Sequence, residues 1–350
     1  MRCGSVKIYK IQPLTLMIPI KYWEEKGRLI KEGNLKLAFY SAAACGGCDV
    51  AILDINESLL DLIEAADIEF WPTAMDVKID DVKEMPDKYI DVTFFNGAIR
   101  IEEQEYMAKL LREKSKILIA YGSCSYIGGI PGLANLFNRM EIFRRAYIET
   151  ASTSNPDGVV PKTHVDIPEG RLELPGFHDD VKTLAQVVEV DYYVPGCPPT
   201  AESTLSVVEA MLRGELPPRG SVLAPPKSVC DECPRNPKGE KKRISEIRRI
   251  HEVTPDSERC LLELGIPCMG PATRGGCGAR CPKANMPCIG CGGPCPDAPE
   301  QGAAMLSALA SIIERGVKME DIERQIKDPI GTFYMFSLPS SIINRRVERK

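Results

Sequence analysis

The chain has 350 residues, enough for one large domain or two moderate ones with a sizeable core. Hydrophobic residues make up 44% and charged residues 27%, which is ordinary for a globular protein and excludes a disordered chain. With 44 basic and 49 acidic residues the net charge is −5, so charge gives no support for nucleic acid as a partner. The unusual feature is 14 cysteines against three histidines, which indicates that any metal sites are bound mostly by sulfur.

The amino-terminal segment carries neither a secretory signal nor a twin-arginine pair. Its mainly apolar run 11–20 contains Pro13 and Pro19 and is too short to span a bilayer, and no other segment approaches the apolar length of a span. We therefore expect a cytoplasmic protein without a membrane span. In that compartment cysteines bind metal more often than they form disulfides, although the even number of cysteines leaves disulfides as an alternative.

Apolar runs alternate with amphipathic segments from residue 35 to about 212. In chain order, the patterns predict strands at 35–43, 67–71, 89–99, 116–123 and 188–196, and helices at 50–66, 102–114 and 202–212. This alternation favours an α/β fold with a mostly parallel sheet covered by helices on both faces. The Pro-, Gly- and Asn-rich segment 130–180 looks like a functional insertion with one short helix near 134–148.

The composition changes near Pro217-Pro218 and Pro225-Pro226. The following segment is rich in Cys, Gly and Pro and cannot build an ordinary hydrophobic core, so we expect metal clusters to hold it together. A helix is predicted at 300–316, and the tail after it has no clear period and is expected to wrap over a partner or over this chain. We divide the chain into an extension (1–34), a sheet domain (35–218), an irregular cysteine-rich iron–sulfur domain (219–300) and a carboxyl-terminal helix with tail (301–350).

Four cysteines follow directly after three predicted strands. Cys45 and Cys48 come after strand 35–43, Cys124 after strand 116–123 and Cys197 after strand 188–196. The carboxyl ends of parallel strands are where open α/β sheets place their ligands. Four thiolates that meet there, with glycines nearby, are what an iron–sulfur cluster requires.

Other interpretations explain only parts of this pattern. A lone C-x-x-C is more often a redox pair or half a zinc site, and the glycine-rich segment around Cys124 could be a phosphate loop, although it lacks the Gly-Lys-Ser/Thr ending. Neither explains why Cys197 falls at the same sheet edge. Structural zinc usually sits in small local knuckles, so the iron–sulfur interpretation is favoured.

Nine further cysteines lie close together in the second half of the chain. Their spacing is Cys230-x2-Cys233-x26-Cys260-x7-Cys268, followed by Cys277-x3-Cys281-x6-Cys288-x2-Cys291-x3-Cys295. Nine cysteines suit two four-thiolate clusters with one left over, and the spacing of the first group does not fit a common zinc pattern. Cys3 is a second spare thiol. Spacing alone does not decide which of the last five is the other spare.

The segments Cys45-x2-Cys48, Gly122-x-Cys124-x3-Gly128-Gly129 and Gly196-Cys197-Pro198-Pro199 resemble the proximal-cluster motifs of [NiFe]-hydrogenase small subunits. The resemblance runs from about residue 35 to 338. Cys230 stands where many periplasmic members have histidine, and the motifs FFNGAI, CGARCP and GTFYMFSLP are most similar to the cytoplasmic archaeal methyl-viologen-reducing type, which does not reduce the deazaflavin coenzyme. Many relatives have Glu-Gly where this chain has Asn96-Gly97, so the role of that glutamate is not transferred.

The resemblance implies a flavodoxin-like amino-terminal domain and three [4Fe–4S] clusters, named proximal, medial and distal, in a line of electron carriers. The implied ligands are Cys45, Cys48, Cys124 and Cys197 for the proximal cluster, Cys277, Cys281, Cys288 and Cys291 for the medial cluster, and Cys230, Cys233, Cys260 and Cys268 for the distal cluster. Cys295 lies beyond the motif.

The same resemblance implies that this chain has no catalytic residue of its own, because that family splits dihydrogen at a nickel–iron centre on a large subunit. Electrons are then expected to pass to an iron–sulfur or flavin partner such as heterodisulfide reductase, which gives a role in methanogenesis. We expect an extensive apolar interface between the cysteine-bearing sheet edge and the large subunit, and neither nucleic acid nor membrane as a partner.

Two alternatives remain at this stage. One is a subunit resembling the cluster-carrying small subunit of the NADH–quinone enzyme, which has adjacent cysteines where this chain has Cys45 and Cys48 and lacks the nine-cysteine segment. The other is a non-redox, zinc-stabilised binding protein. Iron and zinc analysis separates the second from an electron carrier.

Overall fold

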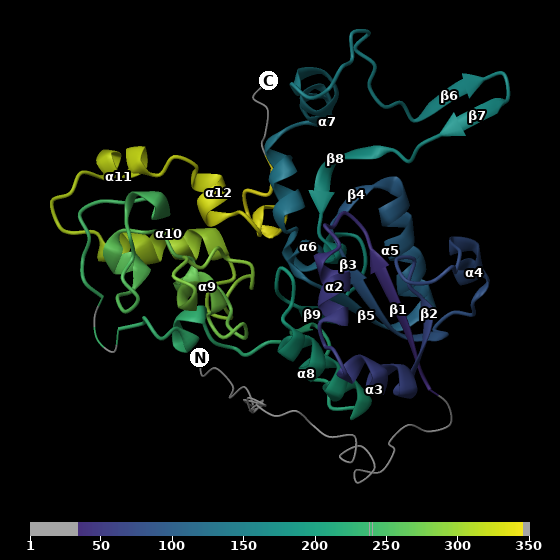
Figure 1. The fold of residues 1–350 in the computed structure, drawn as a ribbon, viewed down its shortest axis with the longest axis horizontal. Helices are drawn as coiled ribbons and strands as arrows, with labels where there is room; N and C mark the ends of the chain where they lie inside the picture. The colour runs from purple at the N-terminus through teal and green to yellow at the C-terminus, as the bar shows by residue number, and fades with distance from the viewer. Residues whose placement is uncertain (1–33, 238, 240, 346–350) are drawn as a thin grey trace, which may run out of the picture.

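The computed structural model describes residues 34–345 except 238 and 240. One lobe is built on a six-stranded parallel sheet with the strand order β10-β9-β5-β3-β1-β2 (Figure 1). The strands are β1 (Leu35–Ser41), β2 (Ala66–Phe70), β3 (Ile90–Asn96), β5 (Ser115–Tyr121), β9 (Tyr192–Val194) and β10 (Ser221–Val222). The order 2-1-3-4-5, here with one extra edge strand, is that of flavodoxin-like folds. The predicted flavodoxin-like α/β architecture is confirmed.

Helices cover both faces of this sheet. They are α2 (Gly47–Leu53), α3 (Ser58–Ala65) and α8 (Ala201–Leu212) on one face, and α4 (Ile79–Glu84) and α5 (Glu102–Lys114) on the other. Because side chains alternate along a strand, Phe39 and Phe94 stack on the first face at 5.2 Å between ring centroids, while Tyr40 and Phe95 pack on the second. The apolar strands are thus buried on both sides, as a parallel sheet requires.

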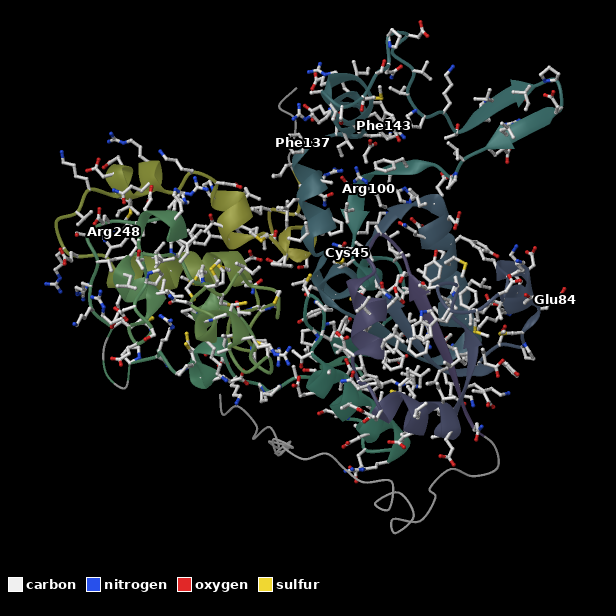
Figure 2. The ribbon with its side chains drawn as sticks, viewed as in Figure 1. Cys45, Glu84, Arg100, Phe137, Phe143 and Arg248 are labelled. Atoms are coloured by element: carbon white, nitrogen blue, oxygen red, sulfur yellow. The ribbon has the colours of Figure 1, made fainter. Side chains whose placement is uncertain are left out.

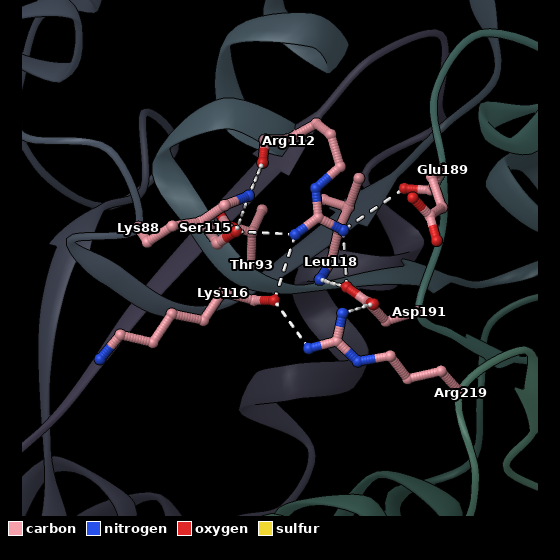
Figure 3. Close-up of polar contacts among 9 residues, drawn as sticks. All are labelled: Lys88, Thr93, Arg112, Ser115, Lys116, Leu118, Glu189, Asp191 and Arg219. Carbon is pink, nitrogen blue, oxygen red and sulfur yellow. Dashed lines mark hydrogen bonds and ion pairs between the residues drawn. The ribbon is translucent and has the colours of Figure 1, made fainter.

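A buried ion-pair network joins β5 to the start of β9 (Figure 3). The carboxylate of Asp191 accepts a hydrogen bond from the Leu118 backbone N–H at 2.8 Å and pairs with Arg112 at 2.6 Å and Arg219 at 2.8 Å. A buried carboxylate is tolerated only when it is paired and hydrogen-bonded in this way. The network therefore fixes the short strand β9, which leads to Cys197.

Two predicted elements end earlier than the sequence pattern suggested. The predicted helix 50–66 is two helices, α2 and α3, separated by a turn in which Asn56 has a φ of 54°. The predicted strand 89–99 ends at Asn96, because Gly97 turns the chain with a φ of 87° and β4 (Ile99–Ile101) leaves the main sheet. Hydrophobic periodicity continues across both turns, which hid them in the sequence.

The insertion between β5 and β9 contains more regular structure than the sequence predicted. Its elements are α6 (Ser123–Ile127), η1 (Ile130–Leu136), α7 (Arg139–Arg144), η2 (Arg145–Glu149), β6 (His164–Ile167), β7 (Gly170–Glu173), β8 (Phe177–Lys182) and η3 (Leu184–Gln186). Strands β6 and β7 form an antiparallel hairpin, and β8 pairs antiparallel with β4. The hairpin projects from the sheet lobe, away from the cysteine-rich lobe (Figure 1).

The cysteine-rich lobe consists of short elements around an apolar core of its own. These are η4 (Val229–Glu232), η5 (Ile250–Glu252), η6 (Leu261–Leu264), η7 (Gly270–Ala272), α9 (Arg280–Lys283), α10 (Gln301–Ile312), α11 (Met319–Gln325) and α12 (Pro329–Phe333). Leu261, Ile266, Met305 and Phe333 lie in that core. The segment 230–300 thus shares a hydrophobic core with α10 and α12, which lie outside that segment and supply much of the apolar surface.

The carboxyl-terminal tail, described up to residue 345, wraps over this chain itself. It includes η8 (Leu338–Ser340). Pro339 packs against Gly128 and Gly132, where a Cβ atom would lie 2.3 and 2.4 Å from its ring. The backbone N–H of Gly129 donates to Phe336 O at 2.9 Å. The tail thus connects the cysteine-rich lobe to the loop that follows Cys124. No helix in the described part of the chain is long and apolar enough to cross a bilayer.

Candidate functional site

The four cysteines predicted at the sheet edge lie where their strands end. Cys45 and Cys48 flank the start of α2 after β1, Cys124 lies on α6 directly after β5, and Cys197 follows β9. Cys48 and Cys124 are buried, whereas Cys45 and Cys197 are exposed. Three distant segments therefore bring four thiols to one rim of the sheet.

Electrostatic coupling shows that these four thiols are neighbours. Burial raises the pKa of Cys48, and the thiols of Cys124, Cys197 and Cys45 raise it further. Burial likewise raises the pKa of Cys124 to about 12, with contributions from Cys197 and Cys45. Like charges so close together disfavour ionisation unless a cation compensates them. The set fits a positively charged metal group that binds thiolates.

Glycines leave room around these sulfur atoms. A Cβ atom on Gly122 would lie 2.5 Å from Cys48 Sγ, and one on Gly129 would lie 2.5 Å from Cys124 Sγ. Neither position can carry a side chain without displacing a thiol. The glycines next to Cys124 are therefore required by space at the sulfur atoms, as their place in the sequence suggested.

A hydrogen-bond network fixes the loop that carries Cys45 and Cys48. Asp49 is buried and accepts hydrogen bonds from Trp71 Nε1 at 3.0 Å and from the hydroxyl of Ser41. Ser41 also lies 3.0 Å from Asn96 Oδ1, at the end of the neighbouring strand. The start of α2 is thus tied to the ends of β1, β2 and β3.

A second set of four cysteines lines one pocket. Cys230, Cys233, Cys260 and Cys268 line this pocket together with Arg235, Asn236 and Gly270. Burial raises the pKa of Cys230 to about 12, and the thiols of Cys268, Cys260 and Cys233 add to the rise. The Nζ of Lys241 lies 3.4 Å from Cys260 Sγ. This cation partly compensates the thiols of the pocket and lowers the pKa of Cys230.

The third set is formed by Cys277, Cys281, Cys288 and Cys291. Burial raises the pKa of Cys291 to about 12, and Cys277 and Cys281 contribute to the rise. Burial also raises the pKa of Cys288 well above its usual range, with Cys268 and then Cys291 as the nearest thiols. Cys291 therefore interacts with the other three thiols, and Cys288 and Cys291 also interact with cysteines of the other two sets.

Direct contacts join the three sets in a fixed order. The backbone N–H of Cys288 donates to Cys268 Sγ at 3.2 Å, which links the third set to the pocket. On the other side, the backbone of Cys197 hydrogen-bonds to the Cys291 thiol and lowers its pKa, opposing the effect of burial. Ser123, next to Cys124, donates to Cys291 O at 2.5 Å. The third set thus lies between the sheet edge and the pocket.

Cys295 lies apart from these groups. Its Sγ is 3.7 Å from Pro271 O, and the charged groups that act on it are Arg274, Asp231 and Asp297. Burial is the main cause that raises the pKa of Cys295 to about 11. Spacing left five candidates for the spare thiol, and this geometry favours Cys295.

Two side chains that sequence reasoning did not identify, the buried Arg235 and the half-buried Glu232, hold the cysteine loops together. Arg235 donates to Pro282 O at 2.8 Å, to Asp256 O at 2.6 Å and to Asn285 Oδ1 at 2.5 Å. Glu232 accepts from the backbone N–H groups of Gly276 and Gly278, on either side of Cys277, at 2.8 and 2.9 Å. Both lie within two residues of Cys233 in the sequence, but no local pattern reveals partners so far along the chain.

Within the described residues, no three His, Cys, Asp or Glu side chains are grouped tightly enough for one metal ion. A [4Fe–4S] cluster is a different kind of group, because its four cysteines bind four separate iron atoms.

Comparison with known proteins places the chain in a family. The chain is 45% identical over 321 residues to the iron–sulfur subunit of the F420-non-reducing hydrogenase of Archaeoglobus profundus, with 89% of this chain and 99% of that protein covered. The chain belongs to the family of F420-non-reducing hydrogenase small subunits. It is also 39% identical to a subunit of the F420-non-reducing hydrogenase of Methanothermobacter marburgensis, over 91% of this chain and 98% of that protein.

This membership confirms the resemblance seen in the sequence, down to the type that does not reduce the deazaflavin coenzyme, and it makes the chain a hydrogenase subunit. The family model described as NADH ubiquinone oxidoreductase, 20 Kd subunit, matches residues 45–211. That match is limited to the sheet lobe, the part that the two families were expected to share. The two relatives above, which match 89% and 91% of this chain, are hydrogenase subunits.

Proposed function

We propose that this hydrogenase small subunit conducts electrons from dihydrogen oxidation on a nickel–iron large subunit to an iron–sulfur acceptor, by means of three [4Fe–4S] clusters. The observation that supports the proposal is a continuous series of interactions among the thiols, from the sheet edge through Cys291 and Cys288 to the pocket. When bound, such clusters supply one-electron carriers of low potential.

The proposed ligands follow this division. The sheet-edge group is Cys45, Cys48, Cys124 and Cys197; the middle group is Cys277, Cys281, Cys288 and Cys291; and the pocket group is Cys230, Cys233, Cys260 and Cys268. Cys295 is then a free thiol. Cys3, the other predicted spare, lies outside the described residues.

The protein itself contributes spacing, insulation and charge. The hydrogen bonds from Cys197 to Cys291 and from Cys288 to Cys268 hold neighbouring groups in contact. Apolar side chains such as Leu261 and Ile266 pack beside the pocket group and exclude water. Lys241 adds a positive charge beside Cys260 that favours the electron-rich state.

The two ends of this path suit different partners. We propose that the large subunit covers the sheet edge, because Cys45 and Cys197 are exposed there. The acceptor then approaches the pocket group at the far end. An iron–sulfur subunit of the heterodisulfide reductase type remains the acceptor that the sequence resemblance implies, and a cytoplasmic location is consistent with such a partner.

Anaerobic purification of the complex with metal analysis and EPR spectroscopy tests the proposal. We expect about twelve iron atoms bound by this chain, no zinc, and signals of three [4Fe–4S] clusters after reduction. A zinc-loaded, colourless preparation contradicts the proposal, and so does a chain that binds a single cluster.

A further inference from the structure

Exposed apolar side chains are concentrated in the insertion that follows Cys124. Ten of the 21 exposed large hydrophobic residues in the described part of the chain fall between residues 130 and 174. They are Ile130, Phe137, Met140, Tyr147, Ile148, Val159, Val165, Ile167, Leu172 and Leu174. An apolar concentration of this kind marks a surface that another molecule covers.

The hairpin β6–β7 shows this most clearly, because one of its faces is apolar. Val165 pairs with Leu172 across the two strands, and both are exposed, by 46% and 59%. Ile167 lies two residues further along β6 and therefore on the same face, and Leu174, the residue directly after β7, continues the alternation; their exposures are 39% and 57%.

The opposite face of the hairpin is charged. It carries the cross-strand pairs His164–Glu173 and Asp166–Arg171. The apolar residues thus lie on one face only. This is the pattern of a strand pair that packs its apolar face against another element or another protein. A two-stranded hairpin is marginally stable alone in water, and every residue of these strands is exposed.

The base of the hairpin is firmly attached to the sheet lobe. Phe143 of α7 packs on Phe177 of β8 with ring centroids 5.1 Å apart, and the guanidinium of Arg100 lies 4.2 Å above the Phe177 ring (Figure 2). Glu102, at the start of α5, accepts a hydrogen bond from the Gly176 N–H at 2.9 Å. The hairpin is therefore held in place by its base, and its apolar face is exposed.

The same base is continuous with the sheet edge that carries the first group of cysteines. Val181 of β8 packs in one cluster with Ala98 and Cys124, and Ala134 of η1 packs against that cluster. In Figure 2, Arg100 lies between Cys45 and Phe143, on the way from the sheet edge to α7. A protein that covers the exposed thiols of Cys45 and Cys197 thus has the hairpin at its border.

We infer that the apolar face of hairpin β6–β7 is a docking arm for the nickel–iron large subunit. The arm takes an apolar patch of that subunit and extends the contact beyond the sheet edge. This inference rests on the proposed function, which puts the large subunit at that edge. The acceptor fits less well, because the pocket group lies in the other lobe and the arm projects away from it (Figure 1).

The test compares two matched double variants in the complete hydrogenase complex. Val165→Thr with Leu172→Thr removes apolar surface but keeps residues that favour strands. His164→Thr with Glu173→Thr makes the same change at the paired positions of the charged face. We expect the first variant to dissociate from the large subunit at a protein concentration at least about tenfold higher than the wild type, and the control to behave like the wild type.

Hydrogen exchange of residues 164–173 gives a second measurement. We expect these amides to be protected in the complex and to lose protection when the large subunit dissociates. Equal dissociation of both variants and the wild type overturns the inference, as does protection that requires only a second copy of this chain or only the acceptor. Iron content is measured in parallel: a complex without iron contradicts the proposed function, whereas an iron-loaded complex with an unprotected hairpin contradicts only the docking arm.

Discussion

At the scale of the residue, Lys241 places a positive charge beside a proposed iron ligand. Its Nζ lies 3.4 Å from Cys260 Sγ and also donates to Asn236 Oδ1 at 2.9 Å. Hydrogen bonds and nearby charges are the means by which a protein sets the potential of a thiolate-bound cluster. Lys241 is therefore expected to favour the reduced state of the pocket group.

Replacing Lys241 by glutamine should lower the reduction potential at that group, because a cation that stabilises the electron is lost. A hydrogen bond to a charged group contributes about 1.5–3 kcal/mol, which corresponds to a shift of at most about 65–130 mV for a one-electron couple. An EPR-monitored potential titration of the reduced complex measures it. Lys242→Gln is the matched control. The backbone N–H of Lys242 donates to Glu263 Oε1 at 2.9 Å, and this contact does not involve the side chain that the variant changes. Equal potentials in both variants contradict the role of Lys241.

Gly122 illustrates how space at one residue controls a metal group. Its φ is 86°, and a Cβ atom there would lie 2.5 Å from Cys48 Sγ. Both backbone conformation and contact with the thiol therefore require glycine.

The Gly122→Ala variant should lose the sheet-edge group while the other two groups remain. The expected result is a fall from about twelve to about eight iron atoms per chain, measured by metal analysis. Gly214→Ala is the control, because Gly214 has a φ of 66° but no atom within 4 Å of a Cβ placed there. A full iron complement in Gly122→Ala would show that the thiol can move aside.

At the scale of the element, the cysteine-rich lobe has short helical turns that side chains must fasten to one another. Arg235 is buried and donates to carbonyl groups of Pro282, Asp256 and Arg259 and to the side chain of Asn285. A single guanidinium thus joins segments that carry ligands of two groups. Removing it leaves several buried acceptors without donors, which costs far more than a surface contact.

We predict that Arg235→Met destabilises this lobe by about 3–5 kcal/mol, the range for breaking a buried charged network. Denaturant unfolding of the iron-loaded chain, followed by the visible absorbance of the clusters, measures the change. Arg248→Met is the control and should change the free energy of unfolding by less than about 0.5 kcal/mol, because Arg248 pairs with Glu246 on the surface. Comparable losses in the two variants would contradict the fastening role of Arg235.

At the scale of the whole molecule, two lobes with different sources of stability share one chain. The sheet lobe has apolar cores on both faces of a parallel sheet. The other lobe has a single apolar core, built by short helices and turns that alternate with the cysteine-bearing loops. Metal ligation is therefore expected to contribute directly to the folding free energy of this lobe. The tail joins the two through Pro339 and the Gly128–Gly132 loop.

Anaerobic removal of iron with a chelator should therefore unfold the cysteine-rich lobe before the sheet. Hydrogen exchange is expected to increase first between residues 260 and 295, while amides in β1, β3 and β5 stay protected. The released thiols take up protons at neutral pH both in the folded lobe, where burial raises the pKa of Cys230 and Cys291 to about 12, and after unfolding, where a thiol has a pKa of about 8.5. Simultaneous loss of protection in both lobes would contradict independent stabilisation.

The sequence by itself determined the sheet lobe and the first group of cysteines. Strands β1, β5 and β9 are local apolar runs, and Cys45, Cys124 and Cys197 follow their carboxyl ends directly. In a parallel sheet those ends meet at one edge, so local position along the chain is enough to predict convergence. The family resemblance rested on the same short motifs.

Only the tertiary structure decided which of the remaining cysteines lie beside one another, where the hairpin projects and what the tail covers. Cys288 hydrogen-bonds to Cys268, and Ser123 hydrogen-bonds to Cys291, which lies 168 positions further along the chain. The turns that carry these cysteines have no hydrophobic periodicity from which the contacts could be predicted. The hairpin's apolar face resembles an ordinary half-buried strand until its exposure is seen. Local periodicity records which face of an element is apolar, whereas the partner of that face depends on contacts between distant parts of the chain.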